Sequence, residues 1–137
     1  MSDVQRLLDN SFPFVEELLK NYGEFYPLAS AIRADDSIAQ IGTFDGNDNP
    51  LSEQVIAVLK KGLRAKKENY KSIIIYYDVR VINPFSGQKT DAVAAYFESK
   101  YDKTAYVFYY PYVLTKGRCI EFFKSWKEEA GKEIFDI

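Results

Sequence analysis

The chain contains no histidine, and Cys119 is the only cysteine among its 137 residues. Without histidine it cannot build a Ser-His-Asp or Cys-His catalytic centre, and it lacks the commonest transition-metal ligand. One cysteine permits no internal disulfide, so we expect a reducing, cytoplasmic location and a buried, unreactive thiol. An enzyme of this composition would have to use carboxylates, lysine, tyrosine or a bound cofactor. The sequence therefore favours a protein without catalysis, and we predict no cofactor.

Strong charge and long apolar runs are also missing. The formal net charge is −2, so nucleic-acid binding gains no overall electrostatic support. No apolar run approaches the roughly 20 residues of a membrane helix, and the polar, amphipathic N-terminus is unlike a signal peptide. The glycine patterns GxxxxGK and GxGxxG, which cradle phosphates, do not occur. We therefore predict no nucleic-acid partner and no membrane partner.

One segment matches part of the sequence pattern of a calcium-binding loop but lacks the rest of it. Asp45, Asn47 and Asn49 occupy alternate positions, as calcium ligands do. An EF-hand loop needs glycine and glutamate at the positions that Pro50 and Ile56 occupy here. We interpret residues 45–50 as a polar loop and predict no metal site.

Aromatic residues are in surplus, with eleven tyrosines and ten phenylalanines. Together with β-branched residues they dominate four runs between residues 72 and 127, which predict four consecutive strands of one antiparallel sheet. Pro111 cannot donate a ladder hydrogen bond, so we expect the pairing to be interrupted there or to face an edge. Residues 119–130 also fit helical spacing, so a helix stays open, although the alternation of apolar residues favours a strand.

The preceding half of the chain predicts two helices and a hairpin. Residues 3–22 have helical apolar spacing, with Pro13 as a kink or the start of a second helix and Gly23 as the end. Residues 25–33 and 37–44 predict a hairpin that turns at residues 34–36. Asn49 and Pro50 suit the cap and first position of another helix. We predict one α+β domain over residues 1–137, an antiparallel sheet with two helices packed against it, in the order α-β-β-α-β-β-β-β.

Polar side chains in the predicted sheet form a first candidate site. Asp78 and Arg80 share one face of a strand with Tyr76. Glu98 in the next strand could join them, and so could Arg33 if the hairpin lies nearby. Such a cluster would bind a small polar ligand or a partner, whereas the alternative is a solvated or structural ion pair.

Aromatic side chains form a second candidate site. The exposed aromatic surface that they would build is typical of protein interfaces, although a core has the same requirement. The tyrosine surplus exceeds what a small core can bury with every hydroxyl satisfied, so we expect some rings at a rim. The residues concerned are Tyr106, Phe108, Tyr110, Tyr112 and Trp126, and Tyr26 in the hairpin is a further binding candidate.

Several short segments resemble a widespread family of small bacterial proteins. Residues 23–29 resemble its GEFYPFA start, residues 77–81 its YDVRV strand, residues 90–93 its TDAI segment, residues 111–112 its PY and residues 134–135 its closing IF. The family's last strand looks like YGEIF, whereas residues 120–123 contain no glycine. The resemblance implies no reaction, because none is established for the family, and it favours a strand over residues 119–127. Analogy of size and fold adds the suggestion of an immunity partner of a toxin.

The leading functional hypothesis is a cytoplasmic bacterial protein-interaction module without catalysis. Its partner would be another protein, as for an immunity protein, or a second copy that forms a homodimer through the aromatic strands. The alternative is a small-molecule-binding protein or enzyme with Asp78, Arg80 and Glu98 in a pocket. Nucleic-acid binding ranks last, and it would use the basic second half of the later helix, at Lys60, Lys61, Arg64, Lys66 and Lys67.

Overall fold

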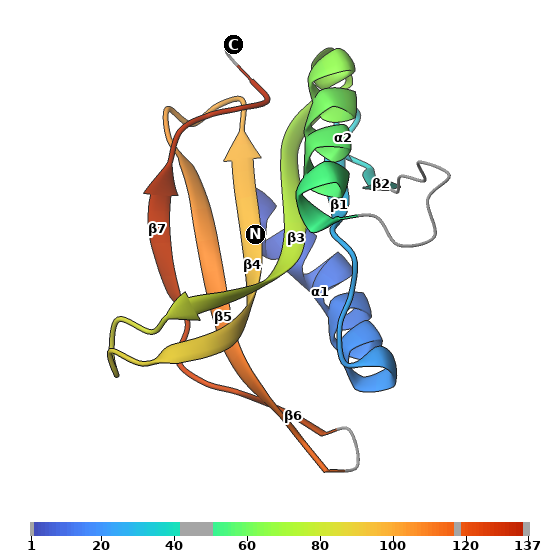
Figure 1. The fold of residues 1–137 in the computed structure, drawn as a ribbon. Coiled ribbons are helices and arrows are strands. Elements are labelled where there is room, and N and C mark those ends of the chain that lie inside the picture. Colours follow the sequence, from blue (N-terminus) through green and yellow to red (C-terminus); the bar gives the residue numbers. More distant parts are fainter. Residues whose placement is uncertain (1, 42–50, 117–118, 136–137) are drawn as a thin grey trace.

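The computed structural model describes residues 2–41, 51–116 and 119–135. An antiparallel, curled sheet carries helix α1 (Asp3–Tyr22) on one face and helix α2 (Ser52–Ala65) on the other (Figure 1). A short 3-10 turn over Lys67–Asn69 follows α2. The strands are β1 (Leu28–Arg33), β2 (Ile38–Ile41), β3 (Tyr70–Ile82), β4 (Lys89–Ser99), β5 (Ala105–Thr115), β6 (Cys119–Phe122) and β7 (Trp126–Ala130). The predicted α+β class is confirmed, and the element order matches except that the last predicted strand is two strands.

Helix α1 has the bounds that its apolar spacing predicts. The Ser2 side chain accepts a hydrogen bond from the Gln5 backbone N–H (3.3 Å) at its start. Gly23 ends it in the left-handed region, with φ +75°, and donates its N–H to the Leu19 carbonyl oxygen (2.8 Å). Pro13 lies inside one continuous helix, so the alternative of a second helix that starts there is wrong.

The sheet has the strand order β2-β1-β3-β4-β5-β6, and β7 also pairs with β5. The hairpin of β1 and β2 turns at residues 34–36 as predicted, and Asp36 takes the positive φ of 78°. Residues 25–27 were predicted as strand but precede β1. Residues 42–50, which include the predicted end of this hairpin, the polar loop and the Asn49-Pro50 helix start, lie outside the described residues.

The outer edge of β5 pairs with two strands in succession. Strand β6 pairs with residues 112–115 of β5, and β7 pairs with residues 105–109. Between the two ladders the Phe123 N–H donates to the Pro111 carbonyl oxygen (2.9 Å). The predicted interruption at Pro111 is therefore confirmed, and residues 119–130 form strands rather than a helix.

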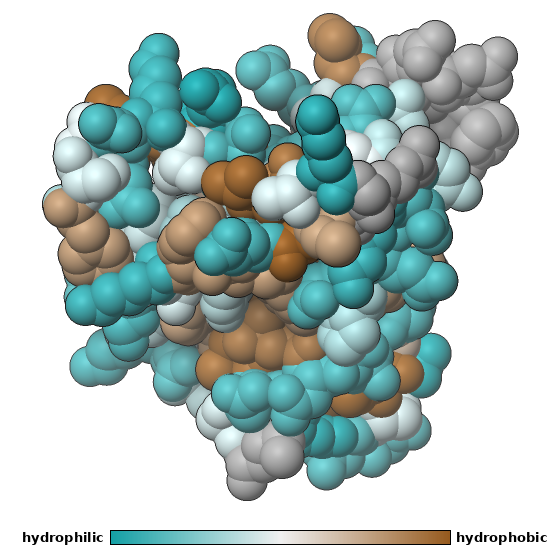
Figure 2. All heavy atoms as spheres, turned by 90° about the horizontal axis from the view of Figure 1, so that it is seen from below, coloured by the Kyte–Doolittle hydropathy of each residue, from teal (hydrophilic) through white to brown (hydrophobic). Residues whose placement is uncertain are grey.

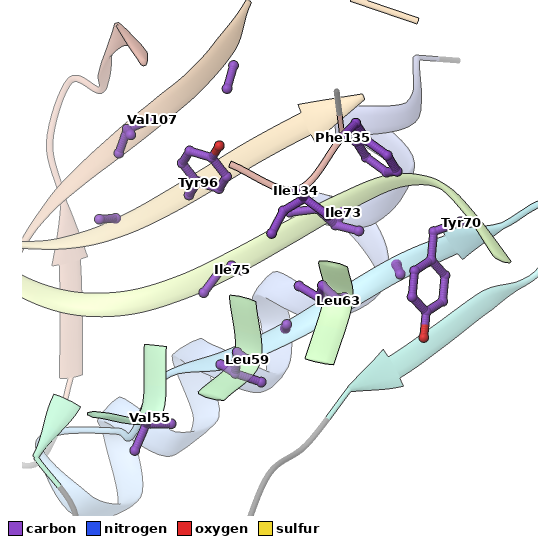
Figure 3. Packing of buried hydrophobic residues seen from close by; sticks show 14 residues of the cluster. Val55, Leu59, Leu63, Tyr70, Ile73, Ile75, Tyr96, Val107, Ile134 and Phe135 are labelled. Atoms are coloured by element: carbon purple, nitrogen blue, oxygen red, sulfur yellow. The ribbon is translucent and has the colours of Figure 1, made fainter. Parts of the chain in front are cut away.

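Two hydrophobic cores form because both faces of β3 and β4 are covered. Ile73 and Ile75 face α2, whose Val55, Leu59 and Leu63 point at them (Figure 3). Alternate residues of the same strand, including Ile74 and Tyr76, face α1. Each such fully buried side chain contributes about 1.5–3 kcal/mol of transfer free energy, so the central strands hold the fold together. No helix among the described residues is long and apolar enough to cross a membrane.

Candidate binding site

Strand register brings Asp78 and Tyr112 to the same face of the sheet, the one that carries α1. Asp78 of β3 lies opposite Val93 of β4, and Val93 lies opposite Tyr110 of β5. Directly paired residues of antiparallel strands point to the same side, and side chains alternate along each strand, so Tyr112 shares that side. The Tyr112 hydroxyl donates a hydrogen bond to Asp78 Oδ1 (2.7 Å).

The electrostatic environment of Asp78 disfavours its charge. Burial of this half-buried carboxyl raises its pKa above the ordinary value. The hydrogen bond from Tyr112 lowers the pKa, but the carboxylates of Asp91 and Glu24 raise it again. Asp78 is therefore a carboxylate that would gain from a cation brought close to it.

A pocket of about 530 Å³ opens beside Asp78. It lies between the last turns of α1, the segment before β1, the first turn of α2 and the middle of β3. Its described lining is mostly aromatic and acidic: Leu18, Tyr22, Glu24, Phe25, Tyr26, Ser52 and Asp78. Figure 2, which views the molecule from below the orientation of Figure 1, shows hydrophobic residues gathered in the middle of that side and hydrophilic ones around them. We call this end of the molecule, from Tyr22 to Tyr26 with Leu51, Ser52 and Asp78, the pocket face.

None of the described residues that line this pocket carries a positive charge. The nearest arginine along β3 is Arg80, which forms an ion pair with Asp91 (3.2 Å). That pair is more than half exposed on both sides, so it contributes little to stability. The predicted alternative of a solvated ion pair describes Arg80 well. Asp78 is paired with the Tyr112 hydroxyl instead of with Arg80.

Glu98 does not join Asp78, and the expectation of one polar cluster is wrong. Glu98 lies opposite Ile73, so it points to the α2 face, while Asp78 points to the α1 face. It is fully buried and accepts the backbone N–H groups of Glu133 (2.7 Å), Ile134 (3.1 Å) and Phe135 (2.5 Å). The Tyr96 hydroxyl, at 2.5 Å from Oε1, is a fourth partner. Glu98 thus fixes residues 133–135 against α2, a structural role.

Arg33 is also remote from Asp78. It ends β1 opposite Tyr70, at the far end of β3, and its side chain is exposed and donates to Ser37 Oγ (3.1 Å). The hairpin packs against β3 as expected, but the antiparallel register carries its turn away from the pocket. Arg33 therefore lies outside the site.

Four residues of the predicted aromatic surface, Tyr106, Phe108, Tyr110 and Tyr112, share the α1 side of β5, whereas Trp126 does not. Tyr76 is fully buried, and its hydroxyl lies 2.6 Å from Ser11 Oγ, while Tyr110 packs on Phe12 with ring centroids 4.9 Å apart. Both belong to the α1 side. Trp126 lies on the other side, stacked on Tyr109 at 5.2 Å. The strand aromatics thus serve mainly as core and packing residues, as the alternative interpretation held.

Of the predicted residues, the pocket face brings together Tyr26 and Asp78, and Tyr112 is linked to it by its hydrogen bond to Asp78. Sequence reasoning missed Tyr22, Glu24, Leu51 and Ser52. Tyr22 fitted the apolar stripe of α1, yet the structure leaves it 72% exposed. Its place in the last turn before Gly23 is the signal that could have found it, because a helix end projects beyond the core. Sequence has no comparable signal for Ser52, which reaches the pocket only through the packing of α2.

The remaining chemical expectations concern metals and the thiol. Among the described residues no group of three histidine, cysteine, aspartate or glutamate side chains could hold a metal ion. Asp45, Asn47 and Asn49 lie outside the described residues. Cys119 is exposed at the start of β6, so the predicted burial of its thiol is wrong. Two of the basic residues of α2 are engaged at Glu133, since Lys60 pairs with its carboxylate (2.5 Å) and Arg64 donates to its carbonyl oxygen (3.4 Å).

Comparison with known proteins found no match to a family model, to a curated protein or to a solved structure. The family likeness of the short segments therefore stays a resemblance.

Proposed function

We propose that the chain is a protein-interaction module without catalysis, and that the pocket face is its binding surface. The observation that carries the proposal is the ring of exposed apolar side chains around the hollow. Tyr22, which is 72% exposed, and Tyr26, which is 50% exposed, line the pocket, and Leu51, which is 65% exposed, directly precedes the lining residue Ser52. An immunity-like role, which the segment resemblance suggests, would be one instance of this function.

Large apolar side chains grouped around a hollow and rimmed by polar residues are typical of interaction sites. Tyrosine is among the residues that most often carry binding energy, because its broad ring buries area while its hydroxyl finds a polar partner. Tyr22 and Tyr26 flank Phe25, which is buried and holds the segment between α1 and β1 in place. The two rings therefore stand on a fixed base, and little conformational freedom would be lost on binding.

The test is an affinity capture of the tagged protein with surface variants. Tyr22→Ser and Leu51→Ser each remove an exposed apolar side chain from the pocket face, and we expect each to reduce retention of a stoichiometric partner about tenfold. Phe14→Ser is the control matched to Tyr22→Ser, because Phe14 is 53% exposed on the same helix but lies outside the pocket face. Circular dichroism should show that all three variants stay folded.

Retention that falls equally with Phe14→Ser, or that is unchanged by Tyr22→Ser and Leu51→Ser, would overturn the assignment of this face. Recovery of the tagged protein alone would count against a protein partner, provided that light scattering shows a monomer. A dimer that dissociates with Tyr22→Ser and Leu51→Ser would identify the partner as a second copy.

A second candidate function is the binding of a small molecule. The pocket volume of about 530 Å³ lies within the range of about 300–1,000 Å³ that small-molecule sites have, and Asp78 supplies an oriented polar group. A thermal-shift screen of metabolites separates the two functions. A compound that stabilises the wild type but not Asp78→Asn, in a protein that captures no partner, would favour this alternative.

A further inference from the structure

We infer that the pocket beside Asp78 binds the guanidinium or ammonium group of a basic side chain presented by the protein partner. This inference rests on the proposed function and adds the chemistry by which the pocket face would recognise its partner. It follows from three features of the pocket: its carboxylates, its aromatic walls and the absence of a cation among its described lining residues.

The carboxylates determine the sign of the ligand's charge. Asp78 lies in the wall and Glu24 stands exposed at the rim, so an anion entering the pocket would meet two negative groups. Asp78 already receives the hydrogen bond of Tyr112 at Oδ1 (2.7 Å), which orients the carboxyl and leaves Oδ2 as an acceptor for an N–H donor. The environment that disfavours the Asp78 charge would be relieved by a bound cation, as its raised pKa indicates.

The aromatic walls determine that the cation is organic. Tyrosine faces attract ammonium and guanidinium groups through the ring quadrupole, by about 0.5–2 kcal/mol per contact. A hard metal ion would instead require six or more oxygen ligands, and the described lining offers two carboxylates and the Ser52 hydroxyl. Leu18 and Phe25 supply apolar surface for an aliphatic stem, which lysine and arginine side chains lay against such surface while the charged head seeks polar partners.

A partner side chain fits this pocket better than a free amine for a structural reason. The exposed apolar residues Tyr22, Tyr26 and Leu51 extend the surface beyond the pocket, where a small amine would leave them uncovered. A polypeptide carrying the basic group would cover them. The inferred partner segment is thus a basic residue flanked by apolar ones.

The experiment is an NMR titration of the labelled protein with two capped amino acids, N-acetyl-arginine methylamide and its neutral isostere N-acetyl-citrulline methylamide. We expect arginine to shift the amides of residues 18–26, 52 and 78, and to bind at least fivefold more tightly than citrulline. Asp78→Asn should weaken arginine binding at least fivefold. Asp9→Asn is the charge-matched control, because Asp9 lines a separate pocket of about 570 Å³ on α1, and it should leave binding unchanged.

Equal binding of arginine and citrulline, shifts elsewhere on the chain, or an Asp78→Asn variant that binds like the wild type would each overturn the inference. Its failure can be told apart from failure of the proposed function. A captured partner that depends on Tyr22 and Leu51 but not on Asp78 would refute the cation pocket and leave the interaction face standing. Arginine binding that depends on Asp78, with no partner that depends on Tyr22 or Leu51, would support the cation pocket and refute the interaction face.

Discussion

Glu98→Gln should lower the free energy of unfolding by about 3 kcal/mol, because Glu98 holds residues 133–135 with charge-assisted hydrogen bonds. Glutamine keeps one oxygen, which can replace Oε1 as the acceptor for Glu133. Its amide group would then face the N–H group of Phe135, which points at Oε2 at 2.5 Å, whereas the Ile134 N–H lies 3.1 Å from both oxygens and can still donate to the one that remains. Both Ile134 and Phe135 are buried, so water cannot replace the lost acceptor.

The magnitude follows from two opposing effects. A hydrogen bond to a charged group is worth about 1.5–3 kcal/mol; the bond from Phe135 is lost, and the bonds from Glu133, Ile134 and Tyr96 lose the contribution of the charge. Against this, a neutral amide avoids part of the desolvation cost that the fully buried carboxylate bears in the wild type. A net loss of about 3 kcal/mol corresponds to a fall in melting temperature of roughly 10 °C for a chain of this size.

The assay is urea denaturation followed by circular dichroism, together with hydrogen exchange of the amides of residues 133–135. Glu133→Gln is the control, since it breaks the partly exposed ion pair with Lys60 but leaves the backbone N–H bonds to Glu98 intact. It should cost less than about 1 kcal/mol. The reasoning is refuted if Glu98→Gln unfolds within about 1 kcal/mol of the wild type, or if the three amides stay equally protected.

Three further predictions concern charge, alkaline pH and backbone. Asp78→Asn should raise the melting temperature at pH 7, since burial and the neighbouring carboxylates raise the pKa of Asp78 and disfavour its charged form. The gain in melting temperature should shrink as the pH falls towards 3.8, because Asp78 is then protonated in the wild type. A gain that does not change with pH would contradict this cause. Burial raises the pKa of Tyr77 from 10.0 to about 12, so its folded state holds the proton more tightly, and stability should be lost as the pH rises through that window. The tyrosinate absorbance of the buried tyrosines should therefore rise together with the loss of circular dichroism, whereas ionisation of Tyr77 with a midpoint near pH 10 in the folded protein would disprove it. Gly23→Ala should cost about 1 kcal/mol because of its φ of +75°, while Gly62→Ala inside α2, in open space, should stabilise by about 0.5–1 kcal/mol; melting curves that show the same sign for both would contradict the argument.

Local patterns predicted the elements well because they depend on neighbouring residues. The apolar spacing of residues 3–22 and the position of Gly23 sufficed for α1, and Pro111 marked the break in the pairing of β5. The division of residues 119–130 into two strands was not visible, because their aromatic residues fit both helical and strand periods.

The candidate site was only partly predictable, because register is not a local property. Asp78 and Glu98 each have clear alternation within their own strands. Whether the two alternations coincide depends on which residues pair, and a shift of one position exchanges the faces. The observed pairing sets Asp78 opposite Val93 and so places Glu98 on the other side. The exposure of Tyr22 and the position of Ser52 at the pocket depend on how the helices pack on the sheet. Helix packing is still harder to predict from local sequence than strand register.

The interruption opposite Pro111 bears on self-association and aggregation. A long, flat outer strand would be a template for further strands, but β6 and β7 are short ladders of four and five residues separated by residues 123–125. Strand β7 also exposes Lys127, Glu128 and Glu129, whose charges would have to be desolvated by an incoming strand. A second chain would therefore find this margin a poor place to add, and growth into fibres by strand addition there is disfavoured even though β5 is rich in aromatic residues.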